Sequence, residues 1–295
     1  MPCFSPLEAV KSSQGIFFDG RFDGVPIKLP CGRCIGCRLE RSRQWAVRAM
    51  DEASLHPMNC FLTLTYSDEY LPKNGNLCYR DFQLFMKRLR KFVSPVRIQF
   101  LMCGEYGDLN GRAHYHALIF GMDFLDKVPC RTTAANSSIF SSPTLSRLWP
   151  FGHSSIGALT FESAAYVARY SMKKLSGGQV LEMPGGRIDL ETGQVLPGVP
   201  EFLRCSLRPA IGKNWFLRHA DDVYAFDRKV VNGVETKPPR YYDKLLKARH
   251  AFAWDDISKD REERAFLSLA DQTNDRLEAR ERVVNAQFRK LKRNL

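Results

Sequence analysis

The chain has 295 residues, 44% of them hydrophobic, which excludes a disordered chain and allows one large domain or two modest ones. Lysine and arginine outnumber the acids 44 to 32, and the formal charge of +12 favours a polyanionic partner over a merely basic surface, with nucleic acid ahead of an anionic membrane. The chain contains no run of about 18 apolar residues, so no membrane span is predicted. The odd number of cysteines, nine, favours a reducing compartment over a disulfide framework.

Residues 1–57 form a predicted N-terminal segment that contains several cysteines and is basic. It is loop-rich as far as "LPCGRCIGCR", after which "LERSRQWAVRAMDEASL" predicts a helix. Cys31, Cys34 and Cys37 follow one another at two-residue gaps, a spacing typical of structural zinc sites, and Cys3 or Cys60 would supply a fourth thiolate. The alternative is three ordinary reduced thiols.

Cations predicted to contact DNA phosphates gather at three places in the chain. They are Arg33, Arg38, Arg41, Arg43 and Arg48 around the basic helix, Lys174 in "MKKL", and Arg208 and Lys213 in "RCSLRPAIGKNWF". The last stretch also holds Arg204, Trp215 and Phe216, and cations interleaved with aromatics suit single-stranded nucleic acid. A strand and turn packed on a sheet would give the same pattern.

Residues 58–178 carry the clearest alternation of strands and helices. "CFLTLTY", "VRIQFLMCGEY" and "RAHYHALIF" predict strands, the last two joined by the turn "GDLNG". "YRDFQLFMKRLRKFV" predicts a helix capped by Asp81, and "TFESAAYVARYSMKKL" predicts another that begins near Thr160 or Ser163. Residues 129–144 are expected to form a loop. This order predicts an α+β fold, a central antiparallel sheet with helices on one side.

The rest of the chain divides into two predicted parts. Residues 179–250 hold a Gly-rich loop or hairpin and a DNA-contacting region that completes the domain. Residues 251–295 alternate in charge sign and predict an exposed helical tail, with an apolar stripe for docking. The stripe is Phe266, Leu269, Leu277 and Val284.

Two histidines sit inside the strand "RAHYHALIF". Residues two apart on a strand share a face, so His114 and His116 point one way and Tyr115 points into the core. The hairpin brings Glu105 beside them, with Asp108 as a competing carboxylate. Two imidazoles and one carboxylate leave coordination positions open, as a catalytic metal requires. The alternative is a pair of hydrogen-bonded structural histidines.

Two tyrosines and a lysine share one face of the helix near residue 165. Tyr166 and Tyr170 are four residues apart, and Lys173 lies three residues further on. Phosphoryl transfer needs chiefly positioning and charge neutralisation, which a phenol, a metal and an ammonium group can provide. An amphipathic helix that packs two tyrosines into a core is the alternative.

These motifs resemble those of a known family. "RAHYHALIFG" resembles the histidine-hydrophobe-histidine motif of HUH endonucleases, "YVARYSMKK" their two-tyrosine motif, and "FLTLTY" their first-strand motif. "PCGRCIGCR", "TYSDEYLP", "GEYGDLNGRAHYHALIFG" and "PPRYYDKLL" resemble the replication initiators of gokushoviruses, microviruses (Microviridae) that infect bacteria and carry single-stranded DNA. The resemblance covers roughly residues 30 to 250.

The resemblance implies an HUH-like fold and a mechanism. His114, His116 and Glu105 would hold Mg²⁺ or Mn²⁺ at the scissile phosphate of single-stranded origin DNA. Tyr166 would attack first, leaving a 5′-phosphotyrosine and a 3′-hydroxyl that host polymerase extends, and Tyr170 would cut the regenerated origin. Lys173 would neutralise phosphate or assist the leaving group.

Partners and alternatives follow from the same motifs. The chain has no G-x-x-x-x-G-K-[ST] nucleotide-binding loop, so an ATP-driven helicase activity is not expected and a host helicase would unwind the DNA. The expected location is the host bacterial cytoplasm. Two other functions remain open from sequence: a zinc-stabilised nucleic-acid-binding protein without catalysis, and a metal-dependent phosphodiesterase in which water attacks and the tyrosines stack on bases. The oligomeric state is not predicted.

Overall fold

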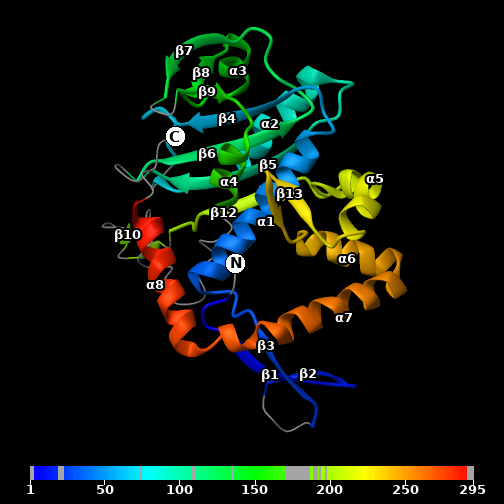
Figure 1. Ribbon diagram of the computed structural model, residues 1–295. Coiled ribbons are helices and arrows are strands. Elements are labelled where there is room, and N and C mark those ends of the chain that lie inside the picture. The colour runs from blue at the N-terminus through cyan, green and yellow to red at the C-terminus, as the bar shows by residue number, and fades with distance from the viewer. Residues whose placement is uncertain are drawn as a thin grey trace. The chain divides into compact units, whose positions relative to one another are not determined.

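The computed structural model describes residues 3–18, 23–72, 75–107, 111–133, 136–169, 187–188, 192, 194–196 and 198–290. The chain forms two compact units: unit 1 comprises residues 1–41 and 243–293, and unit 2 comprises residues 42–242 and 294–295. The fold is α+β with a central antiparallel sheet, as predicted (Figure 1). No helix in the described ranges is both long and apolar enough to span a membrane. The four-part division predicted from the sequence stays a prediction.

Unit 2 is built on a seven-stranded sheet in the order β12-β5-β6-β4-β9-β8-β7. Its strands are β4 (Asn59–Thr65), β5 (Gln99–Tyr106), β6 (Ala113–Phe120), β7 (Val128–Thr132), β8 (Ser138–Ser141), β9 (Ser154–Gly157) and β12 (Phe202–Cys205). All neighbouring strands pair antiparallel. The three predicted strands form the centre, β5-β6-β4.

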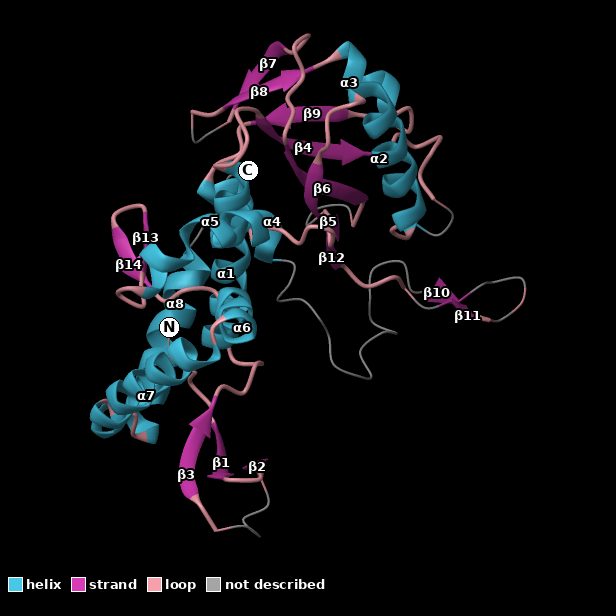
Figure 2. Ribbon diagram, turned by 90° about the vertical axis from the view of Figure 1, so that its right-hand side faces the viewer, coloured by secondary structure: helices cyan, strands magenta, loops and turns pink. Residues whose placement is uncertain are grey.

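One face of the sheet packs against α2 (Tyr79–Val93) and α3 (Pro143–Leu148) (Figure 2). Alternate strand residues such as Leu62, Met102 and Tyr115 meet Phe82 and Phe85 of α2 in this core. The hydroxyl of Tyr115 donates a hydrogen bond to the carbonyl of Cys78, 2.8 Å away, which satisfies the one polar atom of that side chain. Tyr115 therefore points into the core, as predicted.

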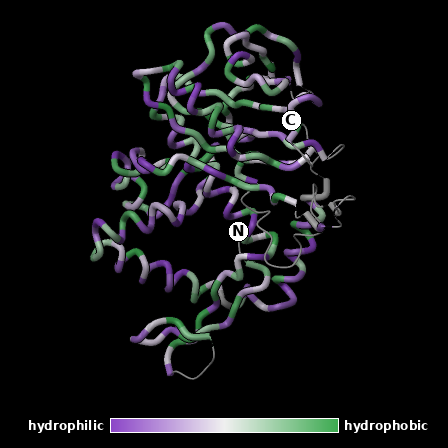
Figure 3. The backbone as a smooth tube through the Cα atoms, turned by 180° about the vertical axis from the view of Figure 1, so that it is seen from behind, coloured by the Kyte–Doolittle hydropathy of each residue, from purple (hydrophilic) through white to green (hydrophobic). Residues whose placement is uncertain are grey.

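The other face packs against α4 (Phe161–Arg169) and the part of α1 (Ile35–Ala53) that belongs to unit 2. Ala46, Ala49 and Ala164 approach Leu101 and Leu118 closely because their side chains are small. The prediction of helices on one side of the sheet was therefore wrong. The central strands β5 and β6 are buried along nearly their whole length, in keeping with a sheet centre covered on both faces, and Figure 3 shows the hydropathy along the chain.

The edge strands β7 and β8 escaped prediction because their sequences are polar. The expected loop at 129–144 contains β8 and most of β7, and is rich in serine and threonine because this edge of the sheet is largely exposed. β12, from the predicted DNA-contacting stretch, pairs with β5. In the Gly-rich region, β10 (Arg187–Ile188) and β11 (Val195–Leu196) pair as a hairpin, one of the two predicted alternatives.

The helix starts follow local chemistry, with one correction. Helix α2 begins after Cys78, and Asp81 is not its cap; the Asp81 carboxylate accepts a hydrogen bond of 2.7 Å from the Tyr66 hydroxyl instead. Helix α4 begins after Thr160, whose hydroxyl accepts from the Ser163 amide at 3.3 Å, while the Ser163 hydroxyl accepts from the Thr160 amide at 2.9 Å. This reciprocal pair fixes the first turn of α4.

A second helical layer of unit 2 contains α5 (Lys213–Tyr224), the hairpin of β13 (Lys229–Val231) and β14 (Val234–Thr236), and the start of α6 (Arg240–Arg249). Buried polar contacts join it to α1. Glu52 accepts a hydrogen bond of 2.7 Å from the Gly212 amide, and Asp51 accepts from the Tyr242 hydroxyl at 2.7 Å while it pairs with Lys229.

Unit 1 combines the N-terminal segment with C-terminal helices. Residues predicted as loop form a three-stranded sheet in the order β2-β1-β3, from β1 (Leu7–Ser12), β2 (Gly15–Phe17) and β3 (Val25–Leu29), which is a correction. The tail is helical as predicted, with α7 (Ala251–Leu267), the 3-10 turn Leu269–Asp271 and α8 (Asn274–Lys290). In the predicted docking stripe Leu277 is buried whereas Phe266 is 73% exposed.

Candidate metal and nucleophile centre

The register of three strands collects the candidate ligands on one face of the sheet. Glu105 of β5 lies opposite His114 of β6, and on the other side of β6 Thr63 of β4 lies opposite His116. These residues share the face on which α4 packs, because strand side chains alternate and all of them fall on the same phase. The site is therefore fixed by the pairing of the central strands.

The candidate groups converge on one carboxylate oxygen. His114 Nε2 lies 2.7 Å from Glu105 Oε1 and His116 Nε2 lies 2.8 Å from it. The Tyr166 hydroxyl of α4 donates a hydrogen bond of 2.8 Å to the same oxygen. The ligand atoms of Glu105, His114 and His116 all lie within 4.8 Å of one another. The sequence-predicted trio and the predicted first nucleophile thus meet at one point.

Contacts to Nδ1, on the side of each ring away from Glu105, fix the orientation of both imidazoles. Nδ1 of His114 lies 3.0 Å from the carbonyl oxygen of Arg112, and Nδ1 of His116 lies 2.9 Å from Thr63 Oγ1. The ring of Phe61 stacks on that of His116 with centroids 5.3 Å apart. Each histidine is therefore held with Nε2 pointing to Glu105, the arrangement that metal-binding histidines require.

This arrangement needs a positive charge between His114 and Glu105. A carbonyl oxygen only accepts, so Nδ1 of His114 carries the hydrogen; in the neutral ring Nε2 would then turn a lone pair toward Glu105 Oε1. A proton or a metal ion between them removes that repulsion. The second carboxylate oxygen, Oε2, is buried and has no hydrogen-bond partner among the described residues. The donors present thus fit a divalent cation.

The electrostatics of the centre agree with this geometry. Burial alone would raise the pKa of Glu105, but hydrogen bonds from His114 and His116 outweigh it and lower that pKa to about 2. Burial lowers the pKa of His114, and the adjacent carboxylate overcomes this, so the pKa of His114 is raised. His116 is more deeply buried, and the pKa of its ring is lowered.

Tyr166 approaches the centre from the helix. Burial first, and the Glu105 carboxylate second, raise the pKa of the Tyr166 phenol above its ordinary value. The guanidinium of Arg169 lies 5.3 Å from the centroid of the tyrosine ring. Tyr170, Lys173 and Lys174, together with the competing Asp108, lie outside the described residues, so their predicted roles stay predictions.

Sequence reasoning missed two residues of the centre, Thr63 and Phe61. Both lie in "FLTLTY", which predicted a strand without a site residue. Their two-residue spacing placed them on one face of β4. What the sequence lacked was the pairing of β4 with β6, which brings that face against His116.

A second ligand group lies in unit 1. The sulfur atoms of Cys3, Cys31, Cys34 and Cys37 all lie within 4.8 Å of one another. Cys60, the alternative fourth thiolate, is buried in the core of the sheet. Of the two candidates named from sequence, the structure therefore brings Cys3 to the cluster.

The predicted DNA contacts fall into distinct environments. Arg33, Arg41, Arg208 and Lys213 are exposed, and Arg38 and Arg43 are partly buried. The guanidinium of Arg43 donates a hydrogen bond of 3.0 Å to the Lys237 carbonyl. Their roles in DNA binding stay predictions.

Two other residues named for nucleic-acid contact are structural. Arg48 is buried, donates two hydrogen bonds of 3.1 and 3.0 Å to the Ile211 carbonyl, and lies over the rings of Trp45 and Tyr241. Phe216 is fully buried in the helical layer, where its ring lies tilted against that of Tyr242 with centroids 5.4 Å apart. Neither side chain is free to contact a nucleic acid, so both predictions were wrong.

Comparison with known proteins places this chain in a family. Residues 59–175 match the family model described as replication-associated protein ORF2/G2P, and that match spans the three central strands and α4. The chain belongs to this family of phage replication-associated proteins. The resemblance to microvirus replication initiators is thereby confirmed.

Three relatives show how much of the chain the family covers. Replication-associated protein VP4 of Bdellovibrio phage phiMH2K is 32% identical over 266 residues, 86% of this chain and 80% of that protein. Replication-associated protein ORF2 of Spiroplasma virus 4 is 32% identical over 297 residues, with 91% and 88% covered. Replication-associated protein ORF4 of Chlamydia phage 1 is 32% identical over 226 residues, with 74% and 53% covered. No solved structure gives a significant match.

Proposed function

We propose that this protein initiates rolling-circle replication of a small single-stranded DNA phage genome by nicking and rejoining origin DNA through a phosphotyrosine. The observation that supports it most is the convergence of the Tyr166 hydroxyl and both histidine Nε2 atoms on Glu105 Oε1. A buried tyrosine hydroxyl needs one hydrogen-bond partner, and here that partner is the same oxygen on which both imidazoles converge. Membership in a family of phage replication-associated proteins supplies the biological setting.

His114, His116 and Glu105 hold a divalent cation, Mg²⁺ or Mn²⁺, in this proposal. Such an ion withdraws negative charge from the non-bridging oxygens of the scissile phosphate. The protein's part is positioning: Thr63 and the Arg112 carbonyl hold the two imidazoles in place, and α4 holds the phenol against the same carboxylate, where a phosphate bound to the ion would lie close to it. Nucleophile and charge-neutralising group are thereby fixed before the DNA arrives.

The chemical step is a transesterification. The Tyr166 phenolic oxygen bonds to phosphorus and gives up its proton, while the bond from phosphorus to the 3′-oxygen breaks and that oxygen takes up a proton. The products are a 5′-phosphotyrosine and a free 3′-hydroxyl, and no water or nucleotide is consumed. The energy of the broken ester is retained in the new one, so the same centre can reverse the reaction and join ends.

The second half of the cycle rests on residues known from sequence alone. Tyr170 follows Tyr166 by one helical turn and cuts the regenerated origin, so that the freed strand closes into a circle. Lys173 neutralises phosphate charge or assists the leaving oxygen. With two nucleophiles, one tyrosine can cut while the other still carries the first strand.

The partners are those that rolling-circle synthesis needs. A host polymerase extends the 3′-hydroxyl and a host helicase opens the duplex, in the cytoplasm of the host bacterium. The cations Arg33, Arg38, Arg41, Arg43, Lys174, Arg208 and Lys213 contact the backbone of the DNA.

A covalent adduct tests the proposal. The full-length protein is incubated with end-labelled single-stranded DNA from the phage origin and Mn²⁺, and the products are separated under denaturing conditions. We expect a labelled protein band that a protease removes. Tyr166→Phe should abolish the first adduct and retain DNA binding, whereas Tyr224→Phe, a change in α5 away from the centre, should give the wild-type amount.

Other outcomes contradict parts of the proposal. Cut DNA without an adduct would mean that water is the nucleophile. A salt-sensitive mobility shift with neither cutting nor adduct would mean that the protein only binds DNA. An undiminished adduct in Tyr166→Phe that disappears in Tyr170→Phe would move the first attack to Tyr170.

A further inference from the structure

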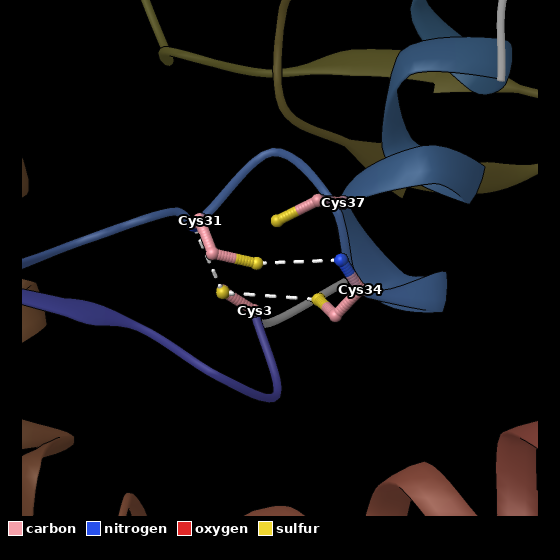
Figure 4. Close-up of side chains that lie close together, drawn as sticks. All are labelled: Cys3, Cys31, Cys34 and Cys37. Carbon is pink, nitrogen blue, oxygen red and sulfur yellow. Dashed lines mark hydrogen bonds between the residues drawn. The ribbon is translucent and has the colours of Figure 1, made fainter. Parts of the chain in front are cut away.

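The cysteine cluster of unit 1 is separate from the nicking centre and calls for its own explanation. Cys31 lies in a loop, Cys34 immediately precedes α1, Cys37 lies in the first turn of α1, and Cys3 lies near the N-terminus of the chain. Figure 4 shows the four side chains converging from these three places, and all four cysteines are free thiols. Residues 28 or more positions apart are thus brought to one point without a disulfide.

The spacing of the sulfurs fits one metal ion. Four thiolates at the usual zinc–sulfur distance of about 2.3 Å from a single ion stand about 3.8 Å apart. Sγ of Cys3 lies 3.8 Å from Sγ of Cys34, and all four sulfurs lie within 4.8 Å of one another. An iron–sulfur cluster interposes iron and sulfide between its cysteines and holds them further apart. The arrangement favours a single tetrahedral ion.

Backbone amides are aimed at the sulfurs. Sγ of Cys31 accepts from the amides of Arg33 and Cys34 at 3.4 and 3.3 Å. Sγ of Cys3 accepts from the Cys31 amide at 3.2 Å, and Sγ of Cys34 accepts from the Phe4 amide at 3.3 Å. A neutral thiol is a weak acceptor, so four amides directed at three sulfurs suit thiolates. Gly32, with φ of 74°, provides the turn that permits this between Cys31 and Cys34.

The surrounding charge also suits a metal-thiolate centre. One zinc ion with four thiolates carries a net charge of −2. Its place at the N-terminus of α1 puts it at the positive end of the helix dipole. Arg41, two turns into α1, reaches back so that its guanidinium lies 3.4 Å from the Gly32 carbonyl, adding a cation beside the loop.

Unit 1 has little else to hold its N-terminal segment together. Among its described residues, the hydrophobic side chains that are buried are only Phe4, Ala9, Leu246 and Leu277. Unit 2, by contrast, contains both large hydrophobic clusters. Small units with so little apolar burial commonly depend on a metal or a disulfide for stability.

We propose that Cys3, Cys31, Cys34 and Cys37 bind one structural zinc ion, which fastens the N-terminus of the chain to the start of α1. The ion is saturated by four protein ligands and therefore does not take part in catalysis. It fixes the loop that carries Arg33 and orders the segment that leads into β1. The proposal does not depend on the nicking reaction.

Metal content provides the test. The full-length protein is purified under reducing conditions after growth with zinc, and bound metals are quantified by mass spectrometry. We expect one zinc ion per chain that withstands gel filtration, its loss in Cys34→Ser, and its retention in Cys130→Ser, an exposed cysteine of β7 outside the cluster. His114→Ala should retain it too, which separates this site from the Glu105 centre.

Cobalt identifies the ligands. Replacement by Co²⁺ should give strong thiolate-to-cobalt charge-transfer absorption in wild type and His114→Ala, and none in Cys34→Ser. Should Cys34→Ser fail to fold, titration of wild type with a mercurial reagent should release one zinc ion per chain, and Cys130→Ser should release the same amount with one thiol fewer modified. Metal-free wild type with reactive thiols, a disulfide between these cysteines, or bound iron with sulfide would each overturn the proposal.

Discussion

The two ligand clusters of this protein are supported in opposite ways. Glu105, His114 and His116 stand on the central strands of a seven-stranded sheet with a hydrophobic core on each face. The four cysteines stand on a loop, a chain end and the first turn of a helix, in a unit with few buried apolar side chains. The sheet positions its candidate ligands through strand pairing, whereas under the proposed zinc site the cysteines would depend on an ion to stay together.

The comparison shows how a protein can separate metal for reaction from metal for structure. In the sheet, Glu105 Oε1 accepts from Tyr166, and a proton on His114 can replace an ion, so under the proposed function an ion could enter and leave without loss of the fold. In the loop, sulfur atoms gather where hydrophobic packing is scarce. If both proposals hold, the fold assigns an exchangeable ion to its well-packed unit and a permanent ion to its weakly packed unit.

The largest expected effect comes from removal of Mg²⁺ and Mn²⁺. Gel filtration removes these ions, and no strong chelator is used, so that thiolate-bound zinc would stay in place. Adduct formation should fall by on the order of 10²–10³-fold, because the ion supplies several kcal/mol of transition-state stabilisation. The thermal unfolding midpoint should stay unchanged, because hydrogen bonds within the sheet hold the ligands. Calorimetry and the adduct assay on one sample measure both, and Mn²⁺ should restore activity. A large fall in the midpoint would mean that the sheet centre, too, depends on its ion for folding.

Thr63→Val addresses the support behind His116, with a smaller effect. The change keeps the shape of the side chain and removes the oxygen 2.9 Å from His116 Nδ1, so the ring loses the contact that fixes its orientation. Affinity for Mn²⁺ should weaken by about 10–100-fold, the usual size for loss of such a partner. Titration calorimetry measures it.

Thr63→Ser is the matched control for this prediction, because it retains the hydroxyl and should keep most of the affinity. Equal affinities in the valine and serine variants would show that packing by Phe61, and not the hydroxyl, orients the ring.

The smallest expected effect concerns acid stability in metal-free protein. The folded-state pKa of Glu105 is lowered to about 2, below the ordinary value of about 4.3 for glutamate. A lowered pKa stabilises the fold above the unfolded value, and that contribution is lost as pH falls from about 4 toward 2. Urea unfolding of wild type should therefore weaken more steeply over this range than that of Glu105→Gln. Parallel curves would show that the ionised carboxylate adds nothing to stability.

Local sequence patterns predicted the parts of the site that depend on local geometry. The two-residue period placed His114 and His116 on one face, and a short turn placed Glu105 opposite them. Thr63 could not be found this way, because it reaches His116 only through the pairing of strands 53 residues apart. Composition misled for β7 and β8, since serine and threonine at an exposed sheet edge look like a loop.

Sequence alone also could not choose between residues of the same type that offer the same chemistry. Cys3 and Cys60 were equal candidates for the fourth thiolate, and only the fold shows that one joins the loop while the other is buried in the core. The same applies to Arg48. Its charge predicted contact with a DNA phosphate, but its guanidinium donates hydrogen bonds to the buried carbonyl of Ile211 in unit 2.

The hydrogen bond between Tyr166 and Glu105 affects how readily the phenol can react. While its hydrogen is bonded to the carboxylate, the phenol has little tendency to ionise, because both burial and the negative charge of Glu105 raise its pKa. Under the proposed function, the phenol becomes reactive only when Glu105 exchanges it for another partner. Under the proposed function, this hydrogen bond would keep the phenol unreactive between rounds of phage DNA synthesis, which would protect the host chromosome from nicking.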